Sequence, residues 1–133
     1  MNPEIEMILR VLLATALGAG IGYQRERSDK PAGLRTHSLI ALGSALFTLA
    51  SIFGFGTGVD PSRIAAGIVA GVGFIGAGVI FRTSGDLVAG LTTAASIWVT
   101  ASVGLAAGAG MYLLSFLVAL IAAAVLMIPK VRE

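Results

Sequence analysis

Apolar residues run through this chain in long stretches separated by short polar segments. Five stretches come close to the roughly 20 residues that an α-helix needs to cross a bilayer; they cover about 5–23, 36–55, 61–81, 87–108 and 111–128. None alternates apolar and polar residues as the strands of a membrane barrel do. Because backbone polar groups must be hydrogen-bonded inside a membrane, each stretch is predicted to be helical. We expect an all-α protein, a polytopic transmembrane helix bundle of about five spans that forms a single domain, 1–133.

Turn and cap residues stand between the apolar stretches. Asp60-Pro61 suits the start of the third helix, because aspartate can cap free amides and proline fits the first helical position. Asp86 is predicted to cap the fourth helix in the same way. The sequence from Gly108 to Gly110 leaves room only for a tight turn, so the last two helices should form an antiparallel hairpin.

Composition narrows the class of protein. The chain is 56% hydrophobic and 12% charged, whereas soluble domains carry about 25% charge. It has no cysteine, which excludes disulfides and thiol chemistry. Neither a Gly-x-Ser-x-Gly nor a His-Glu-x-x-His motif occurs, so we expect no enzyme. The net charge of +2 is better explained by membrane topology than by nucleic-acid binding.

Charge at the loops predicts orientation. With five spans, the first loop, the third loop and the C-terminal tail share one side, and that side holds Arg25, Arg27, Lys30, Arg35, Arg82, Lys130 and Arg132. The other side holds Arg63, together with Arg10 if its side chain extends outward beside Glu6. Positive charge accumulates on the cytoplasmic side, which predicts an N-terminus outside and a C-terminus inside. A count of four spans weakens this bias without removing it.

Small residues recur at a spacing that suits close packing of membrane helices. The predicted packing glycines are Gly18, Gly22, Gly67, Gly71, Gly73, Gly76, Gly78, Gly104 and Gly108. Packing within the protomer is the favoured interpretation, and an interface in a homodimer or other homo-oligomer is the alternative. The segment 71–76 also fits the pattern G-x-G-x-x-G, but a nucleotide site needs a preceding strand that is not predicted here. A lumen lined by bare backbone is a further alternative for this segment.

Hydroxyl side chains mark one face of the fourth stretch, at Thr92, Ser96 and Thr100, with Thr93 beside them. The simpler interpretation is hydrogen bonding to the same or a neighbouring helix; a hydrophilic pathway for water or an ion is the alternative. His37, the only histidine, is interpreted as a structural group, with pH sensing or ligand binding as alternatives. Trp98 is interpreted as a packing residue.

Three segments together resemble the MgtC/SapB family of bacterial membrane proteins. They are Gly22 to His37, with its Arg-Glu-Arg and Lys-Pro-Ala-Gly-Leu-Arg-Thr-His sequences, the stretch from Arg63 to Ile80, and Gly90-Leu-Thr-Thr-Ala-Ala-Ser-Ile-Trp98. The resemblance implies a multi-pass protein of the bacterial inner (plasma) membrane. It also implies a link to magnesium limitation, to virulence inside phagocytes and to inhibition of the proton-translocating ATP synthase. Because the chain ends at Glu133, it is similar to the short SapB-like form without a soluble C-terminal domain.

Topology and these motifs together predict one polar site facing the cytoplasm. Its expected members are Glu26, Arg27, Arg35, Thr36, His37, Arg82, Asp86, Thr92 and Thr93. No cofactor is expected, and Mg2+ remains an unproven ligand because no carboxylate lies mid-membrane, where transporters usually hold coupling ions.

Two functions follow from this picture. The favoured one is a regulatory protein of magnesium homeostasis that binds partners through its helices, in contact with the lipid bilayer and with a membrane subunit of the ATP synthase as candidate partner. The alternative is a pore or carrier for Mg2+ or protons.

Overall fold

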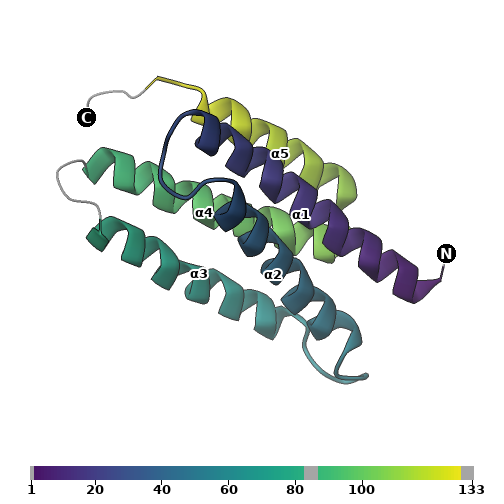
Figure 1. Cartoon of the computed structure of the whole chain (residues 1–133). Helices are drawn as coiled ribbons and strands as arrows, with labels where there is room; N and C mark the ends of the chain where they lie inside the picture. Colours follow the sequence, from purple (N-terminus) through teal and green to yellow (C-terminus); the bar gives the residue numbers. More distant parts are fainter. Residues whose placement is uncertain (1, 83–86, 130–133) are drawn as a thin grey trace.

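The computed structural model describes the backbone of residues 2–82 and 87–129, with side chains for all of these except 87–89. It contains five α-helices: α1 (Pro3–Arg27), α2 (Leu34–Phe53), α3 (Ser62–Arg82), α4 (Leu87–Gly108) and α5 (Tyr112–Leu126). The described residues form no strand, so the predicted all-α class is confirmed. Successive helices run in opposite directions, so that α1, α3 and α5 end where α2 and α4 begin (Figure 1).

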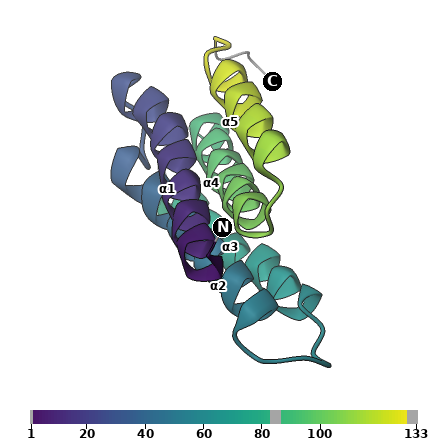
Figure 2. The same ribbon diagram turned by 90° about the vertical axis from the view of Figure 1, so that its right-hand side faces the viewer.

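Helix α4 lies at the centre of the bundle. It contacts each of the other four helices, whereas α3 contacts only α4 and α2 among the described residues. The perpendicular view shows α1, α4 and α5 side by side (Figure 2). Helix α3 is therefore peripheral, and only Ile68 and Gly76 of its residues are buried.

Four helices, α1 to α4, are long and apolar enough to cross a membrane. Helix α5 has 15 residues, which gives it a length of about 22 Å, shorter than a hydrocarbon core of about 30 Å. It runs in the same direction as α1 and packs against α1 and α4 (Figure 1). The five predicted apolar stretches are all helical, and the first helix extends four residues past its stretch, to Arg27.

Local capping explains where the helices begin and end. Asn2 accepts a hydrogen bond of 2.8 Å from the amide of Glu4, and Pro3 occupies the first turn of α1. Asp60 accepts from the amide and the hydroxyl of Ser62 at 3.0 and 2.7 Å, as the Asp60-Pro61 pair predicts. A tight turn with Gly110 at φ +88° connects α4 to α5, which confirms the predicted hairpin. Asp86 lies outside the described residues.

Four of the nine predicted glycine positions hold the helices together inside the protomer. A Cβ built on Gly18 would lie 2.6 Å from the backbone oxygen of His37 and from the Cβ of Ala41, and one on Gly104 would lie 2.9 Å from the Cα of Ala41. A Cβ built on Gly22 or Gly108 would come similarly close to α2 or to the residue before it. Close approach of α1 and α4 to α2 thus requires glycine at these sites.

The glycines of α3 behave differently. A Cβ built on Gly76 would make only an ordinary contact of 3.4 Å with Ala94. No described atom lies within 4 Å of a Cβ built at Gly67, Gly71, Gly73 or Gly78. For these four the favoured expectation of packing within the protomer is wrong, because α3 lies at the edge of the bundle. An interface with another copy remains a prediction.

Candidate functional site

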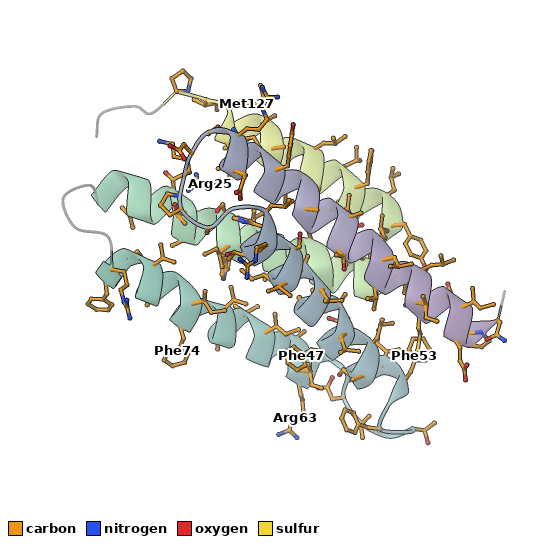
Figure 3. All side chains as sticks on the ribbon, in the orientation of Figure 1. Arg25, Phe47, Phe53, Arg63, Phe74 and Met127 are labelled. Carbon is orange, nitrogen blue, oxygen red and sulfur yellow. The ribbon has the colours of Figure 1, made fainter. Side chains whose placement is uncertain are left out.

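A buried polar cluster lies where the end of α1 meets the beginning of α2 and the first turns of α4. Its members are Arg25, His37, Thr93 and Ser96, and each exposes 3% or less of its surface. Figure 3 shows Arg25 beneath the loop that connects α1 to α2. Arg25 follows Gly18 by seven residues and Gly22 by three, so it lies on the same packed face of α1 as these glycines.

His37 uses both ring nitrogens, one toward the start of its own helix α2 and the other toward α4. Nδ1 lies 2.9 Å from the carbonyl oxygen of Gly33, and Nε2 lies 3.0 Å from the hydroxyl of Ser96. Ser96 in turn donates to the carbonyl of Thr93 at 2.7 Å. His37 is fully buried, so this arrangement fits the structural interpretation, in which the ring fixes the register of two helices.

Arg25 connects three segments of the chain. Its Nη2 donates to the hydroxyl of Thr93 and, at 3.2 Å, to the carbonyl of Pro31. Its Nε is buried and has no hydrogen-bond partner among the described residues. A buried guanidinium is costly in an apolar environment unless its donors are satisfied. Among the described residues the only ion pair joins Arg10 to Glu6, so Arg25 relies on neutral oxygens.

Hydroxyls of α4 bond largely within their own helix, as the simpler interpretation predicts. Thr100 donates to the carbonyl of Ser96 at 2.7 Å, and Ser96 donates one turn back in the same way. Ser44 of α2 crosses over to the carbonyl of Ala101 at 2.7 Å. Trp98, in contrast, is 56% exposed, which corrects its interpretation as a packing residue within the protomer.

The predicted site residues separate into two groups. His37 and Thr93 join the buried cluster, whereas Arg27, Arg35, Arg82 and Thr92 are exposed and Thr36 is half-buried. The guanidinium of Arg27 lies over the ring of Tyr23, 5.9 Å from the ring centroid. Asp86 again lies outside the described residues. All the described members sit at one end of the bundle (Figure 1), but they do not converge on a common point.

Glu26 has a structural contact that sequence reasoning did not anticipate. Its Oε1 accepts a hydrogen bond of 2.9 Å from the amide of Leu34, the first residue of α2. Gly33, the residue before the helix, supplies no side-chain cap. The carboxylate therefore caps α2 and fixes the angle between α1 and α2, because an anion is stabilising at a helix N-terminus.

Arg25 and Ser96 are the polar residues whose importance sequence reasoning underestimated. The topology prediction includes Arg25 only as a loop charge, although its spacing from Gly18 and Gly22 indicates a position on the packed face. Ser96 was recognised within the hydroxyl stripe but not as the partner of His37. No signal in the sequence connects positions 37 and 96, which are brought together only by the crossing of α2 and α4.

The opposite end of the bundle holds a second arginine with more partners. Arg10 donates to the hydroxyl of Tyr112 at 2.9 Å, to the carbonyl of Gly108 at 2.8 Å and to Glu6 at 3.3 Å. It thereby satisfies a free carbonyl at the C-terminus of α4, where a cation is favourable. The predicted pairing of Arg10 with Glu6 is confirmed.

An apolar groove of about 650 Å³ separates α2 from α3. Glycines open both of its walls, Gly43 on α2 and Gly67 and Gly71 on α3, and Phe47 and Arg63 lie toward one end of it (Figure 3). The pattern G-x-G-x-x-G belongs to this continuous helix and not to a loop after a strand, so the context that a nucleotide site requires is missing.

Apolar helices of membrane-spanning length, joined by buried polar contacts among α1, α2 and α4, define a multi-pass α-helical membrane protein. Comparison with known sequences gives the family: the chain matches the MgtC family over residues 11–133 and belongs to it. No solved structure matches the chain.

Individual relatives agree with this assignment. The chain is 53% identical over 114 residues to the Escherichia coli K12 protein named "Putative magnesium transporter YhiD", a match that covers 80% of this chain and 53% of the relative. It is 46% identical over 118 residues to SapB of Bacillus subtilis, covering 84% and 50%. It is 49% identical over 106 residues to MgtC of Salmonella typhimurium LT2, covering 79% and 44%. The chain thus spans about half the length of these relatives.

Proposed function

We propose that this chain is a regulatory protein of the bacterial inner membrane, linked to magnesium homeostasis, that binds a transmembrane helix of a partner along α2 and α3. The magnesium link is supported by the printed name of one relative and by membership of the MgtC family. A membrane subunit of the proton-translocating ATP synthase is the first partner to test, because the family resemblance implies it.

The observation that carries this proposal is the open face of α3. A helix of 21 residues with only two of them buried offers most of its surface to its surroundings. A Cβ built on Gly67 or Gly71 would have no described atom within 4 Å, and these two glycines line a groove whose other wall is α2. In a membrane, close backbone approach at small residues is what drives one helix to associate with another.

The buried cluster argues for regulation over cation transport. A Mg2+ pathway needs oxygen ligands, preferably carboxylates, whereas the polar interior here is built around the fixed positive charge of Arg25. An arginine in a narrow polar passage repels cations. The hydroxyls of Ser96 and Thr100 are already committed to helix carbonyls.

Orientation in this proposal follows from charge. The described cations at the end of the bundle where α1 stops are Arg25, Arg27, Lys30, Arg35 and Arg82, and Arg10 and Arg63 belong to the other end. By the positive-inside rule the first end is cytoplasmic, which gives an N-terminus outside and a C-terminus inside.

The decisive experiment fills the groove without disturbing the fold. Gly67→Leu and Gly71→Leu place side chains into the groove, and Gly20→Leu is the matched control because Gly20 also has free space around it but lies on α1. We expect the α3 variants to be present at normal protein levels but to lose two properties, function under magnesium limitation and crosslinking to the synthase subunit. The control variant should keep both properties.

Proteoliposomes separate the two function classes. We expect no Mg2+ flux from the purified chain or from its groove variants. Mg2+ flux that is abolished by Thr93→Val, with the groove variants fully active in cells, would contradict the regulatory proposal and favour the carrier. Crosslinks between copies that disappear in Gly71→Leu would instead identify a second copy as the occupant of the groove.

A further inference from the structure

Two buried side-chain atoms lack a hydrogen-bond partner among the described residues, and they belong to neighbouring residues. They are Oε1 of Gln24 and Nε of Arg25. Both residues line a single pocket of about 620 Å³ between the end of α1 and the end of α5. One orphan is an acceptor and the other is a charged donor, and each costs free energy when it is left without a partner. Their coincidence in one pocket indicates a ligand that carries both an anion and a hydrogen-bond donor.

The charge of this pocket suits an anion. Arg27 and Lys30 join Arg25 in its lining, and no described acidic residue lines it. Glu26 and Asp29 adjoin lining residues in the sequence, but neither lines the pocket, and Glu26 is engaged by the amide of Leu34. Arg25 itself is only 3% exposed, so it is a fixed part of the pocket and not a mobile surface cation.

The side chain of Gln24 is held by hydrogen bonds from its amide nitrogen, and its carbonyl oxygen has no partner among the described residues. Its Nε2 lies 3.2 Å from the hydroxyl of Ser28 and 3.2 Å from the carbonyl of Leu126, which connects α1 to the last turn of α5. The amide nitrogen is therefore fully used. A hydroxyl of a glycerol headgroup reaches this buried acceptor once the side chains at the wall of the pocket move apart.

The other wall of the pocket is apolar and exposed. Leu126, Met127 and Ile128 line it, and Met127 and Ile128 expose 71% and 61% of their surface. Tyr23, also in the lining and 55% exposed, is the kind of residue that marks the level of lipid headgroups. Cations beside exposed apolar side chains at this depth match an amphipathic ligand better than a free ion.

We propose that this pocket binds the phosphodiester headgroup of an anionic glycerophospholipid, with the phosphate at Arg25 and a headgroup hydroxyl at Gln24. Basic pockets between membrane helices bind anionic headgroups elsewhere. The site lies away from the groove between α2 and α3, so it is independent of partner binding there.

Binding is measured on the purified full chain in a zwitterionic detergent by native mass spectrometry. Dioctanoyl-phosphatidylglycerol is titrated against dioctanoyl-phosphatidylcholine, which has the same chains and phosphodiester but a quaternary ammonium that cancels its net charge and no headgroup hydroxyl. We expect the anionic lipid to bind at least about tenfold more tightly, because the ammonium is repelled by the cations of the pocket and offers no donor to Gln24. Equal binding of the two lipids would overturn the proposal, because neither the net charge nor the hydroxyl of the headgroup would then be recognised.

Inorganic phosphate identifies the source of the anion. If the lipid is the ligand, millimolar phosphate leaves phosphatidylglycerol binding unchanged. Phosphate that displaces the lipid and binds by itself as tightly would keep an anion site but overturn the assignment to lipid.

Variants locate the site. Met127→Glu puts a carboxylate on the exposed wall without removing a buried contact, and Leu113→Glu, equally exposed at 71% on the same helix but at its other end, is the matched control. We expect Met127→Glu to weaken phosphatidylglycerol binding about tenfold and Leu113→Glu to leave it unchanged. Arg25→Gln should abolish the preference for the anionic lipid. Because Arg25→Gln also removes buried hydrogen bonds, its helix content is checked by circular dichroism, and an unaltered preference in Met127→Glu would by itself refute the site.

Discussion

Replacing Gly104 by alanine should loosen the bundle, whereas the same change at Gly71 should not. A Cβ at position 104 would lie 2.9 Å from the Cα and 3.0 Å from the carbonyl carbon of Ala41 on α2. These are backbone atoms, so no side-chain rotation relieves the contact, and Ala41 is fully buried with its own Cβ against Gly18. Separating α2 from α4 also strains the hydrogen bond from His37 to Ser96.

The expected magnitude is the difference between two opposing effects. Overpacking a filled site costs about 1–3 kcal/mol, while alanine is favoured over glycine inside a helix by about 1 kcal/mol. Gly104→Ala should therefore lower the free energy of unfolding by up to about 2 kcal/mol. Gly71→Ala, with no described atom within 4 Å of the new methyl group, gains only the helical preference and should be neutral or slightly stabilised.

Reversible unfolding in mixed micelles with increasing SDS, followed by circular dichroism, measures this difference. The protein is kept dilute so that contacts between copies do not contribute to the stability of either variant. Equal unfolding midpoints for Gly104→Ala and Gly71→Ala would refute the assignment of Gly104 to the packed face and of α3 to the edge of the bundle.

Further predictions concern the polar contacts at the two ends. Ser96→Ala removes the partner of the buried His37 ring nitrogen and should destabilise the chain by about 1–3 kcal/mol, measured in the same SDS titration. Ser102→Ala is the control, because its exposed hydroxyl bonds only within its own helix, and it should have little effect. Arg10→Gln breaks the contacts to Glu6 and to the last carbonyl of α4 and should cost about 1–3 kcal/mol, with separation of the α4–α5 turn from α1 measured by spin-label distances. The hydroxyl and the amide of the first residue of α3 hold the pKa of Asp60 below its usual value. The capping carboxylate therefore contributes to stability above the pKa of the unfolded chain and loses that contribution as the pH falls through the lowered pKa. Asp60→Asn should reduce the acid dependence of helicity, measured by circular dichroism as the pH falls below the ordinary carboxyl pKa of 3.8.

Hydropathy alone predicts the number and the approximate position of the helices here. The helix ends are less predictable where polar residues continue a helix beyond its apolar stretch, as α1 does to Arg27. The stretch ends at Tyr23 because the lipid-facing side becomes polar, yet the packed side continues through Arg25. The end of an apolar stretch marks the edge of the lipid, whereas capping contacts, such as that of Glu26 with Leu34, determine where a helix begins.

The roles of the glycines could not be read from their spacing. Gly67 and Gly71 have the same separation as Gly18 and Gly22. Gly18 and Gly22 contact α2 or the residue before it, whereas Gly67 and Gly71 contact no described atom. A helix of small and apolar residues can pack with any face, and its neighbours decide which glycines are needed. Likewise, topology predicts that His37 and Ser96 lie toward the same end of the bundle. Their contact, however, depends on how α2 and α4 cross.

The two arginines of α1 show how the ends of this bundle differ. A guanidinium has five donor hydrogens and no acceptor. Arg10 meets a carboxylate, a phenol and a carbonyl, and it also lies 5.7 Å from the ring centroids of Phe53 and Tyr112. Arg25 is more deeply buried. Among the described residues it has two oxygens as partners, and its Nε has none. Since removing a charge from water costs less when an anion comes with it, the end at Arg10 is complete within the protomer, whereas the end at Arg25 gains most from an anion supplied by its surroundings. The proposed headgroup site lies beside Arg25 in the pocket between the ends of α1 and α5. Because Arg25 also contacts α4 through Thr93, a change in headgroup charge should alter the packing of that end before it alters the rest of the bundle.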